Sequence, residues 1–417
     1  MKKELAMLDT DRLQSDASCG LMDRVARRLV LDSLQRFSVG ELTITEPDGN
    51  RVVIGEGFPS ASLHMLDWRT YRMMMTGGAL GAAEAFMEGL WRSDNLVAVI
   101  RYFAANVEPM QSLEGLTTRL ARPMLAALHV INRNSIRGSR RNIAAHYDLG
   151  NDFFSLFLDR QMMYSSAIYP RADADLDEAA VHKLDVVCRK LGLTADHHLL
   201  EIGTGWGGLA IHAARHYGCR VTTTTISREQ YRHACERVRA EGLEDRITVL
   251  EQDYRLLEGQ YDRVVSIEMI EAVGHQYLSN YFSQLNRLLK EDGLLLIQAI
   301  TVPDHRYAFA LKNIDFIKRY IFPGGFLPSV RVMMSHLGDD TRLTPLAVDD
   351  IGLDYARTLE DWRCRFMAAI DKVAEQGFDE RFRRMWEYYL CYCEGAFRER
   401  AISTVQLLAA APGWRPN

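Results

Sequence analysis

A glycine-rich turn holds the first residues with recognisable chemistry. Residues 197–218, HHLLEIGTGWGGLAIHAARHYG, place Gly203, Gly205 and Gly208 between an apolar run and an amphipathic one. Glycines between a strand and a helix let the backbone approach a nucleotide closely. The spacing therefore predicts a nucleotide site, and the neighbouring acids indicate which nucleotide it suits.

The positions of these acids favour S-adenosylmethionine (SAM). A dinucleotide enzyme needs an acid about twenty residues beyond the glycines, where this chain has Thr223-Thr224-Thr225-Ile226. A P-loop is excluded because no Lys-Ser/Thr pair follows the glycines. Acids lie instead at Glu201 and at Asp253. The Asp253 carboxylate, after the third expected strand, can accept a hydrogen bond from an adenine amino group. Structural glycines in an unrelated α/β protein are the alternative.

The surrounding pattern alternates between strands and helices from about residue 195. Apolar strands are expected at HHLLEIG, CRVTTTTI, ITVLEQD, YDRVVSIEM and LLLIQAI, with helices such as SREQYRHACERVRAEGL between them. Such alternation predicts an α/β domain with a mostly parallel sheet covered on both faces. The run ISTVQLLAAA, at 402–411, is expected to add an edge strand.

Upstream of this domain the chain changes character twice. After a tail (1–20), residues 21–115 predict a smaller α+β domain, with a hairpin at Asp48-Gly49. Residues 116–145 predict a basic linker, because six arginines and no acid lie between Arg119 and Arg141. This linker is either solvated or rests on anionic lipid headgroups. The catalytic domain is expected at 146–410, with an insertion at about 303–345.

Composition excludes several classes of protein. The chain has 417 residues, 47% hydrophobic and 25% charged, with a net charge of -5. That balance gives no reason to expect nucleic acid. The start, MKKELAMLDTDRLQSD, does not read as a signal peptide, and no apolar run predicts a transmembrane helix. Seven cysteines without a CxxC pair predict a reduced, cytoplasmic protein. No metal site is predicted.

From His146 to about Leu407 the chain resembles the cyclopropane-fatty-acid synthases and mycolic acid cyclopropane synthases. The resemblance rests on HYDLGNDFFSLFLD, MMYSSAIYP, LLEIGTGWGGLA, TISREQ, SIEMIEAVG, DFIKRYIFPGGFLPS and WEYYLCYCEGAFRER. It implies a class I SAM-methyltransferase fold, Rossmann-like, with a seven-stranded sheet. The N-terminal region resembles the extra domain of the phospholipid-acting branch. The resemblance also implies a homodimer, associated peripherally with the inner face of a phospholipid bilayer.

The resemblance assigns eight positions to SAM. They are Tyr164 and Ser165 at the methionyl part, Gly203 and Gly205 in the glycine turn, Thr225 and Gln230 at the ribose, and Asp253 and Tyr254 at the adenine. For the tyrosine and threonine positions, ordinary core packing is the alternative.

The resemblance also implies a bound bicarbonate as the catalytic base. In the family it is held by a cysteine-position amide, a glutamate, a histidine, an isoleucine carbonyl and a tyrosine. This chain keeps Glu271 and Ile300, but has Ser166, Gln298 and Arg363 at the other three positions. Whether bicarbonate still binds is left open by these changes. Tyr389 either presents an aromatic face to a cationic intermediate or packs in a helical core.

Glu268 is a further departure, because it stands where the family commonly has glycine. It lies three residues before Glu271 at the end of an expected strand. The two carboxylates either form a hydrogen-bonded pair, or Glu268 substitutes for bicarbonate as the base. A salt bridge between Glu268 and Arg363 is the structural alternative.

The predicted activity is transfer of a methylene or methyl carbon from SAM to a cis double bond of a phospholipid acyl chain. A cyclopropane is the first expectation, and a methyl- or methylene-branched chain is the alternative, because the position of the base selects the product. An N- or O-methyltransferase of small molecules and a non-enzymatic SAM- or lipid-binding protein are the rivals. Residues 316–329 form either a structural loop or a flap over an acyl channel, with Lys318 and Arg319 near headgroup phosphates.

Overall fold

The computed structural model describes residues 19–109 and 149–416. The predicted basic linker, and all but the last two residues of the predicted tail, lie outside the described residues. The chain divides into two compact units, which are described separately. One comprises Met1–Arg122 with Phe378–Gly395, and the other Pro123–Gly377 with Ala396–Asn417. Within the described residues, no helix is long and apolar enough to span a membrane.

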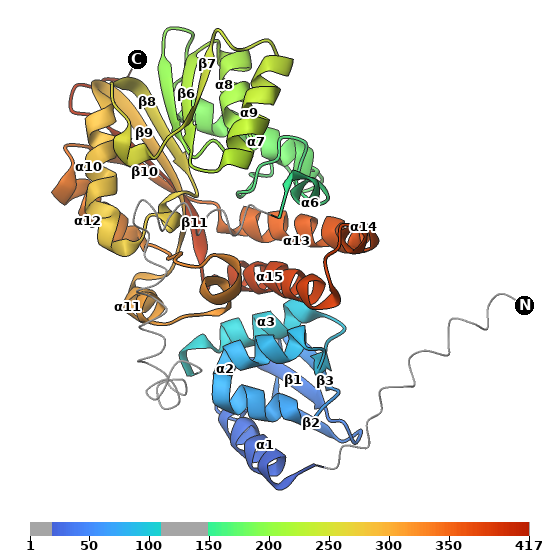
Figure 1. Cartoon of the computed structure of the whole chain (residues 1–417). Helices are drawn as coiled ribbons and strands as arrows, with labels where there is room; N and C mark the ends of the chain where they lie inside the picture. Colours follow the sequence, from blue (N-terminus) through green and yellow to red (C-terminus); the bar gives the residue numbers. More distant parts are fainter. Residues whose placement is uncertain (1–18, 110–148, 417) are drawn as a thin grey trace, which may run out of the picture. The chain divides into compact units, whose positions relative to one another are not determined.

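The N-terminal unit is built on a four-stranded sheet in the order β2-β1-β3-β4. The predicted hairpin is confirmed, because β1 and β2 pair antiparallel on either side of Asp48-Gly49. Its strands are β1 (Gly40–Thr45), β2 (Arg51–Glu56), β3 (Ser60–Met65) and β4 (Trp91–Arg92), and its helices are α1 (Leu21–Leu34), α2 (Arg69–Met87) and α3 (Leu96–Ala105) (Figure 1).

Most of helix α15 (Glu380–Arg398) also belongs to this unit, although it lies within the predicted catalytic domain. The ring of Tyr388 packs on Phe86 with centroids 5.6 Å apart. Arg381 pairs with Glu88 at 2.8 Å. A helix near the end of the chain therefore completes a unit that begins with the first residues.

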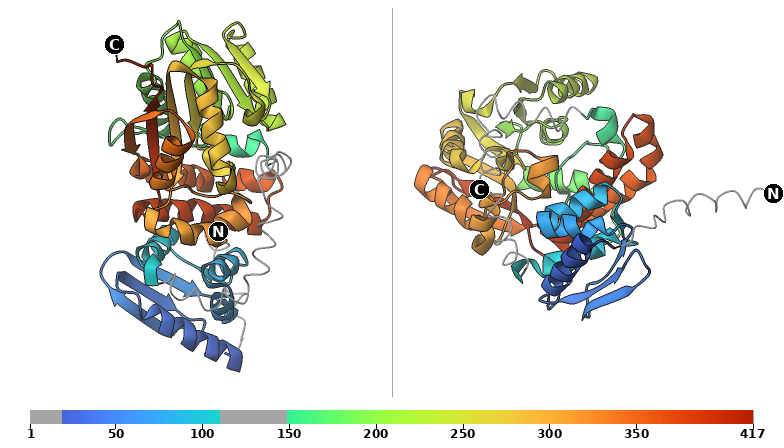
Figure 2. Two further views of the ribbon diagram at one scale, coloured as in Figure 1. Left: turned by 90° about the vertical axis from the view of Figure 1, so that its left-hand side faces the viewer. Right: turned by 60° about the horizontal axis from the view of Figure 1, so that its bottom comes forward.

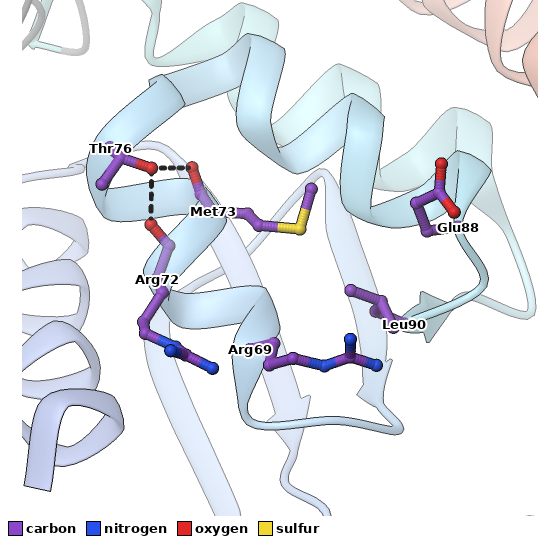
Figure 3. A pocket seen from close by; sticks show the side chains of 6 residues that line it. All are labelled: Arg69, Arg72, Met73, Thr76, Glu88 and Leu90. Carbon is purple, nitrogen blue, oxygen red and sulfur yellow. Dashed lines mark hydrogen bonds between the residues drawn. The ribbon is translucent and has the colours of Figure 1, made fainter. Parts of the chain in front are cut away.

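A pocket of about 410 Å³ lies beside α2 in the N-terminal unit (Figure 3). Its lining residues are Arg69, Arg72, Met73, Thr76, Glu88 and Leu90. Arg69 pairs with Asp67, Arg72 with Asp23, and Glu88 with Arg381. A ligand here would compete with existing ion pairs, so the pocket does not by itself indicate a charged ligand.

The second unit is a three-layer α/β structure around a seven-stranded sheet in the order β10-β11-β9-β8-β5-β6-β7. Strands β5 to β9 run parallel, and β11 pairs antiparallel with both of its neighbours. The predicted mostly parallel sheet is confirmed. The strands are β5 (His198–Ile202), β6 (Arg220–Thr225), β7 (Ile247–Glu251), β8 (Tyr261–Ile267), β9 (Leu289–Thr301), β10 (Thr344–Asp350) and β11 (Ser403–Ala410).

The expected edge strand lies inside the sheet. Strand β11 is flanked by β9 on one side and β10 on the other. Its apolar residues are buried on both faces, as an interior strand requires. The outer position belongs to β10, whose side chains are mostly exposed.

Two hydrophobic clusters cover the faces of this sheet. Helices α7 (Leu176–Lys190), α8 (Gly208–Tyr217) and α9 (Arg228–Ala240) pack on one face, and α10 (Leu278–Leu288) and α12 (Val330–Asp340) on the other (Figures 1 and 2). Neighbouring strand residues alternate between the clusters, because side chains alternate across a strand. Thus Leu199 faces the first set of helices and Leu200 the second.

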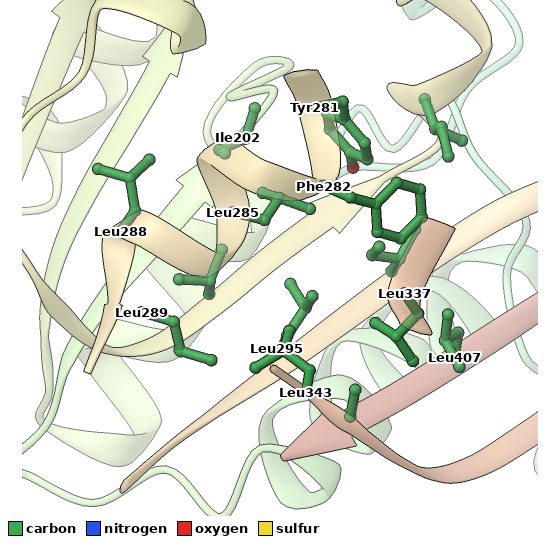
Figure 4. Close-up of a cluster of buried hydrophobic side chains, with 14 of the residues drawn as sticks. Ile202, Tyr281, Phe282, Leu285, Leu288, Leu289, Leu295, Leu337, Leu343 and Leu407 are labelled. Carbon is green, nitrogen blue, oxygen red and sulfur yellow. The ribbon is translucent and has the colours of Figure 1, made fainter. Parts of the chain in front are cut away.

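The predicted insertion contains α11 (Asp304–Lys312), a π-helical turn at Ile317–Ile321 and helix α12. Met333 and Leu337 of α12 are buried in the core shown in Figure 4. The C-terminal part of the insertion is therefore one of the helices that cover the sheet. Helices α13 (Gly352–Ala368) and α14 (Ile370–Glu375) follow β10, and a short helix, α6 (Asn151–Ser155), begins the described part of this unit.

Leu285 provides a test of this packing. It is fully buried between α10 and the sheet (Figure 4). Leu285→Ala should lower the free energy of unfolding, followed in urea, by about 2–5 kcal/mol, because a cavity remains where the side chain was. Leu346→Ala is the matched control, since Leu346 is 43% exposed. Equal losses in the two variants would contradict the assigned core.

Candidate active site

The glycine turn joins β5 to α8 in a conformation that suits glycine. Gly203, Gly205 and Gly207 have φ values of 102°, 53° and 87°. The backbone N–H groups of Gly203 and Thr204 both donate to the carbonyl of Thr224, each at 3.0 Å. Gly205 faces open space, because a Cβ atom there would meet nothing within 4 Å. The turn is therefore fixed at its base and leaves room for a ligand above Gly205.

Glu201 lies beneath this turn and is tied to it through hydroxyl groups. Thr223 donates to the Glu201 carboxylate at 2.6 Å, and the hydroxyls of Thr204 and Thr223 are 2.8 Å apart. Burial raises the pKa of Glu201 to about 8. The acid of the Glu-x-Gly-x-Gly motif is thus mostly protonated at neutral pH, where it links β5, β6 and the turn.

Thr225 and Gln230, the predicted ribose residues, lie together at the end of β6. The Thr225 hydroxyl donates to Oε1 of Gln230 at 2.8 Å. The Ser227 N–H donates back to Thr225, and the Ser227 hydroxyl caps helix α9. The structure therefore brings the two residues together, and their contact with ribose stays a prediction.

Asp253 and Tyr254, the predicted adenine residues, follow β7. Arg255 binds both oxygens of the Asp253 carboxylate, at 2.8 and 2.6 Å. The Tyr254 ring packs edge-on against Tyr281, with centroids 5.7 Å apart. Oδ1 of Asp253 also accepts from the Arg255 backbone N–H at 3.0 Å, so Oδ2 is the oxygen that retains a lone pair for an adenine amino group.

Tyr164 and Ser165, the predicted methionyl residues, meet two groups that sequence reasoning missed. The Tyr164 ring packs on fully buried Trp362, with centroids 5.3 Å apart. The ammonium of Lys183, also fully buried, donates to Ser165 Oγ at 3.0 Å. Burial lowers the pKa of Lys183 to about 8, and the carboxylates of Glu268, Asp159 and Glu201 oppose that shift. Lys183 could have been found from the sequence, because it is a charged residue on the apolar face of helix α7.

The Glu268 carboxylate is held by three donors from separate parts of the chain. Oε1 accepts from the Ser166 backbone N–H at 2.9 Å and from Gln298 Nε2 at 2.8 Å, and Oε2 accepts from the Tyr355 hydroxyl at 2.8 Å. Burial raises the pKa of Glu268, and these three hydrogen bonds and the Lys183 charge oppose the rise. The carboxylate is thus buried, which disfavours its charge, but its three hydrogen-bond donors stabilise the ionised form.

Glu268 also has an unusual backbone conformation, with φ at 48°. A residue with a side chain is disfavoured in this left-handed region by roughly 1–2 kcal/mol. That geometry explains why glycine suits the position in the resembling family. Glutamate persists here at an energetic disadvantage, and strain of this kind concentrates at functional sites.

Glu271, the second carboxylate, is bound on one side only. Its Oε1 accepts from the Ile300 N–H at 2.6 Å. Its Oε2 is buried and has no hydrogen-bond partner among the described residues. Burial and the neighbouring Glu268 charge raise the pKa of Glu271 to about 8. The Glu271 carbonyl accepts from the Phe326 N–H at 3.0 Å, which ties the IFPGGF loop to this residue.

The Tyr355 hydroxyl that reaches Glu268 was missed by sequence reasoning, and the placement of Arg363 at the tyrosine position of the family stays a prediction. One expectation about this centre requires correction. The proposed salt bridge between Glu268 and Arg363 does not form, since the acid is bonded to Ser166, Gln298 and Tyr355 instead.

Other predicted residues have clear positions. The Ser166 hydroxyl donates to the Ala167 carbonyl at 2.9 Å, so only its backbone amide serves Glu268, and the cysteine-to-serine change is mild. Tyr389 lies on α15 in the N-terminal unit, packed on Trp386 at 5.2 Å, and its catalytic role stays a prediction. The Lys318 ammonium donates to the Ala310 and Asn313 carbonyls, so it is committed to the backbone rather than to a headgroup.

The site fits SAM and does not fit bicarbonate. Strand ends β5, β6, β7 and β8 bring the glycine turn, Thr225, Asp253 and Glu268 to one edge of the sheet, where ligands of parallel α/β sheets bind. Two of the groups expected to hold bicarbonate, the Ser166 amide and Gln298, already bind the Glu268 carboxylate, as does Tyr355. A second anion would compete with Glu268 for these donors and would be repelled by its charge.

A known structure that contains SAH shares this fold. The crystal structure of mycolic acid cyclopropane synthase CmaA1 complexed with SAH and CTAB matches with a TM-score of 0.61 and 32% identity, over 65% of this chain and 98% of that chain. Fold and site together define a class I SAM-dependent methyltransferase, and SAM is its methyl donor.

Sequence comparison gives the family. The model for mycolic acid cyclopropane synthetase matches residues 134–407, and the chain belongs to this family. Tuberculostearic acid methyltransferase UfaA1 of Mycobacterium tuberculosis (strain H37Rv) is 38% identical over 400 residues, 94% of this chain and 91% of that protein. Cyclopropane-fatty-acyl-phospholipid synthase of Escherichia coli (strain K12) is 39% identical over 343 residues, 81% of this chain and 85% of that protein.

Gly203 provides a test of the cofactor site. Gly203→Val should weaken SAM binding, measured by calorimetry, by at least about tenfold, because a branched residue cannot keep the φ of 102°. Gly242→Val is the control, since Gly242 also has a positive φ, of 63°, but follows α9. Similar SAM affinity in both variants would remove the glycine turn from the binding site.

Proposed function

We propose that this enzyme transfers the methyl carbon of SAM to a cis double bond of an unsaturated acyl chain in membrane phospholipid, and that Glu268 is the base. The observation that carries the proposal is the Glu268 carboxylate, bonded to the Ser166 amide, Gln298 and Tyr355. A carboxylate built into the chain thus stands among the donors that a bicarbonate would need.

The chemistry requires a base at a defined place. SAM supplies an electrophilic methyl group. The π electrons of the alkene form the new carbon–carbon bond as the sulfur–methyl bond breaks, and the neighbouring chain carbon becomes a carbocation. Removal of a proton from the new methyl group closes a cyclopropane. Removal from a chain carbon restores an alkene and leaves a methyl branch. A hydride shift to the cation followed by removal of a proton from the new methyl group gives a methylene branch, so the position of the base decides the product.

Glu268 is better placed to accept this proton than Glu271. Burial raises the pKa of both acids. Glu268 has hydrogen-bond donors on both oxygens and the Lys183 charge nearby, which favour its ionised form, whereas Glu271 has a donor on one oxygen only among the described residues. Oε1 of Glu268 accepts two hydrogen bonds and its Oε2 accepts one from Tyr355. Oε2 therefore keeps a lone pair for the substrate proton.

Aromatic rings near the methionyl position suit a cationic intermediate. Tyr164 packs on Phe154, Phe322 and Trp362, at centroid distances of 5.2, 6.4 and 5.3 Å. Faces of such rings attract positive charge. Together with the carboxylate pair they supply an environment that is apolar yet electrostatically favourable to the carbocation.

We expect a methyl- or methylene-branched product, because the base is a side chain of the protein rather than the bound bicarbonate that the resemblance implies for the cyclopropane-forming family. The similarity to UfaA1, named as a methyltransferase, supports this product. A cyclopropane is the second candidate, supported by the similarity to the E. coli enzyme named as a cyclopropane-fatty-acyl-phospholipid synthase.

The proposal includes peripheral association with a phospholipid bilayer, and a homodimer. Support for bilayer contact comes from α1, where Leu21, Met22 and Val25 are 77%, 68% and 52% exposed. Arg24 and Arg28 on the same helix are also exposed. Exposed apolar side chains combined with arginines suit the surface of an anionic membrane.

The product can be identified directly. Expression in a host without its own cyclopropane synthase should give phospholipid acyl chains heavier by one methylene unit in mass spectrometry. A branched alkene takes up hydrogen under mild catalytic reduction, whereas a cyclopropane resists it. We expect uptake. Resistance would favour the cyclopropane candidate, and unmodified phospholipid would contradict the proposed function.

The role of Glu268 can be tested by a pair of variants. Glu268→Gly relieves the backbone strain and frees three donors, so turnover should fall by about 10²–10⁴-fold and recover with added bicarbonate, with more cyclopropane. Glu268→Gln is the matched control, because its amide still fills the space and cannot act as a base. It should be equally slow and gain nothing from bicarbonate. Unchanged rate and product in Glu268→Gly would exclude Glu268 as the base.

A further inference from the structure

The Gln298 side chain that serves Glu268 is the last link of a longer chain of hydrogen bonds. Lys190 Nζ donates to Gln406 Oε1 at 2.7 Å. Gln406 Nε2 donates to Gln298 Oε1 at 2.9 Å, and Gln298 Nε2 donates to Glu268 at 2.8 Å. Three consecutive hydrogen bonds therefore connect a lysine at the end of α7 with the proposed base.

The sheet places these groups in line. Gln406 on β11 and Gln298 on β9 are paired residues in the antiparallel ladder, and both are fully buried. Lys190 ends helix α7 and also pairs with Asp349 of β10 at 2.6 Å. Two buried amides thus cross the sheet between a partly exposed ion pair and the active site.

The lysine at one end determines the donor-to-acceptor direction of all three hydrogen bonds. An ammonium group only donates hydrogen bonds, so Gln406 must turn its carbonyl oxygen towards Lys190. Its NH₂ group then faces Gln298 and requires the carbonyl oxygen of that amide. Gln298 is left with only its NH₂ group for Glu268, which accepts this bond best when it is ionised.

We propose that Lys190 and Gln406 are positioning residues that lock the orientation of Gln298 and thereby keep Glu268 in its ionised, proton-accepting form. The assignment of Glu268 as the base rests on the proposed function; the lock itself rests on the hydrogen bonds. Neither Lys190 nor Gln406 was selected from the sequence.

Other charged groups around the acid act in known directions. Burial raises the pKa of Glu268, the charge of Lys183 on α7 opposes that rise, and the Glu268 charge in turn raises the pKa of Glu271, which follows β8. Asp349 faces Lys190 at the far end of the chain. Loss of the Gln298 donor should raise the pKa of Glu268, so the base becomes protonated at a higher pH. Turnover is then lost at neutral pH and regained as the pH rises.

Gln406→Glu is the most direct test. A carboxylate at this position still accepts from Lys190 but cannot donate to Gln298, so Gln298 reverses and presents its oxygen to Glu268. The acid limb of the kcat–pH profile should move up by at least about one unit, an approximately tenfold loss of ionised base. KM for SAM and the melting temperature should stay close to those of the parent protein. An unmoved limb would overturn the proposal.

Control variants distinguish an effect of the Gln298 orientation from the effect of an added charge and from damage to the fold. Lys190→Arg keeps a donor-only group and should retain the parent profile, whereas Lys190→Met and Gln406→Met should show smaller upward shifts. In a Gln298→Met background, Gln406→Glu should have little further effect, because the link to Glu268 is missing. A full additional shift in that background would show that charge alone acts, which contradicts the lock.

A spectroscopic measurement distinguishes failure of this inference from failure of the proposed function. Infrared difference spectra of Gln406→Glu at neutral pH should contain the carbonyl band of a protonated carboxyl group that is absent when Glu268→Gln is added. Absence of this band would overturn the lock. If the band appears but Glu268→Gln alone retains normal turnover, the lock stands and the assignment of Glu268 as the base fails.

Discussion

The active centre depends on one buried anion and the donors that surround it. The Glu268 carboxylate joins the loop of Ser166, strand β9 through Gln298 and helix α13 through Tyr355. Burial of an unpaired carboxylate is costly, and hydrogen bonds to the ionised form reduce that cost. The positions of the Ser166 loop, β9 and α13 therefore all depend on contacts with a single acid.

The same acid explains why the site combines strain with strong support. Its φ of 48° is unfavourable for any residue with a side chain. The surrounding contacts compensate: Thr358 accepts from the Ala167 N–H at 3.1 Å, which holds the loop beside Ser166, and Lys183 holds Ser165. The Phe326 N–H holds the Glu271 backbone from the other side. A glycine would release the strain but would also remove the carboxylate that binds Ser166, Gln298 and Tyr355.

Local patterns predicted much of this arrangement. Alternating strands and helices gave the parallel sheet, and glycine spacing together with the absence of an acid at Thr225 gave the SAM turn. The family resemblance, rather than these patterns, singled out Glu268, Glu271, Ser166, Gln298 and Ile300, and hydrogen bonds connect Ser166 and Gln298 to Glu268 and Ile300 to Glu271. The missing members are Tyr355, Lys183 and Gln406. Their roles depend on contacts between distant segments: Gln406 reaches Gln298 only through the register of β11 on β9, and no spacing along the chain contains that register.

The assignment of α15 was missed for a related reason, and it has a consequence for how such a protein can be divided. Residues 378–395 belong with the N-terminal unit, yet the chain before and after them belongs to the other unit. The two units are thus interleaved rather than consecutive. A single cut before residue 123 would leave Tyr388 without Phe86 and Arg381 without Glu88. Exchange of the N-terminal unit between relatives, by recombination or by design, must therefore include this helix as a second segment.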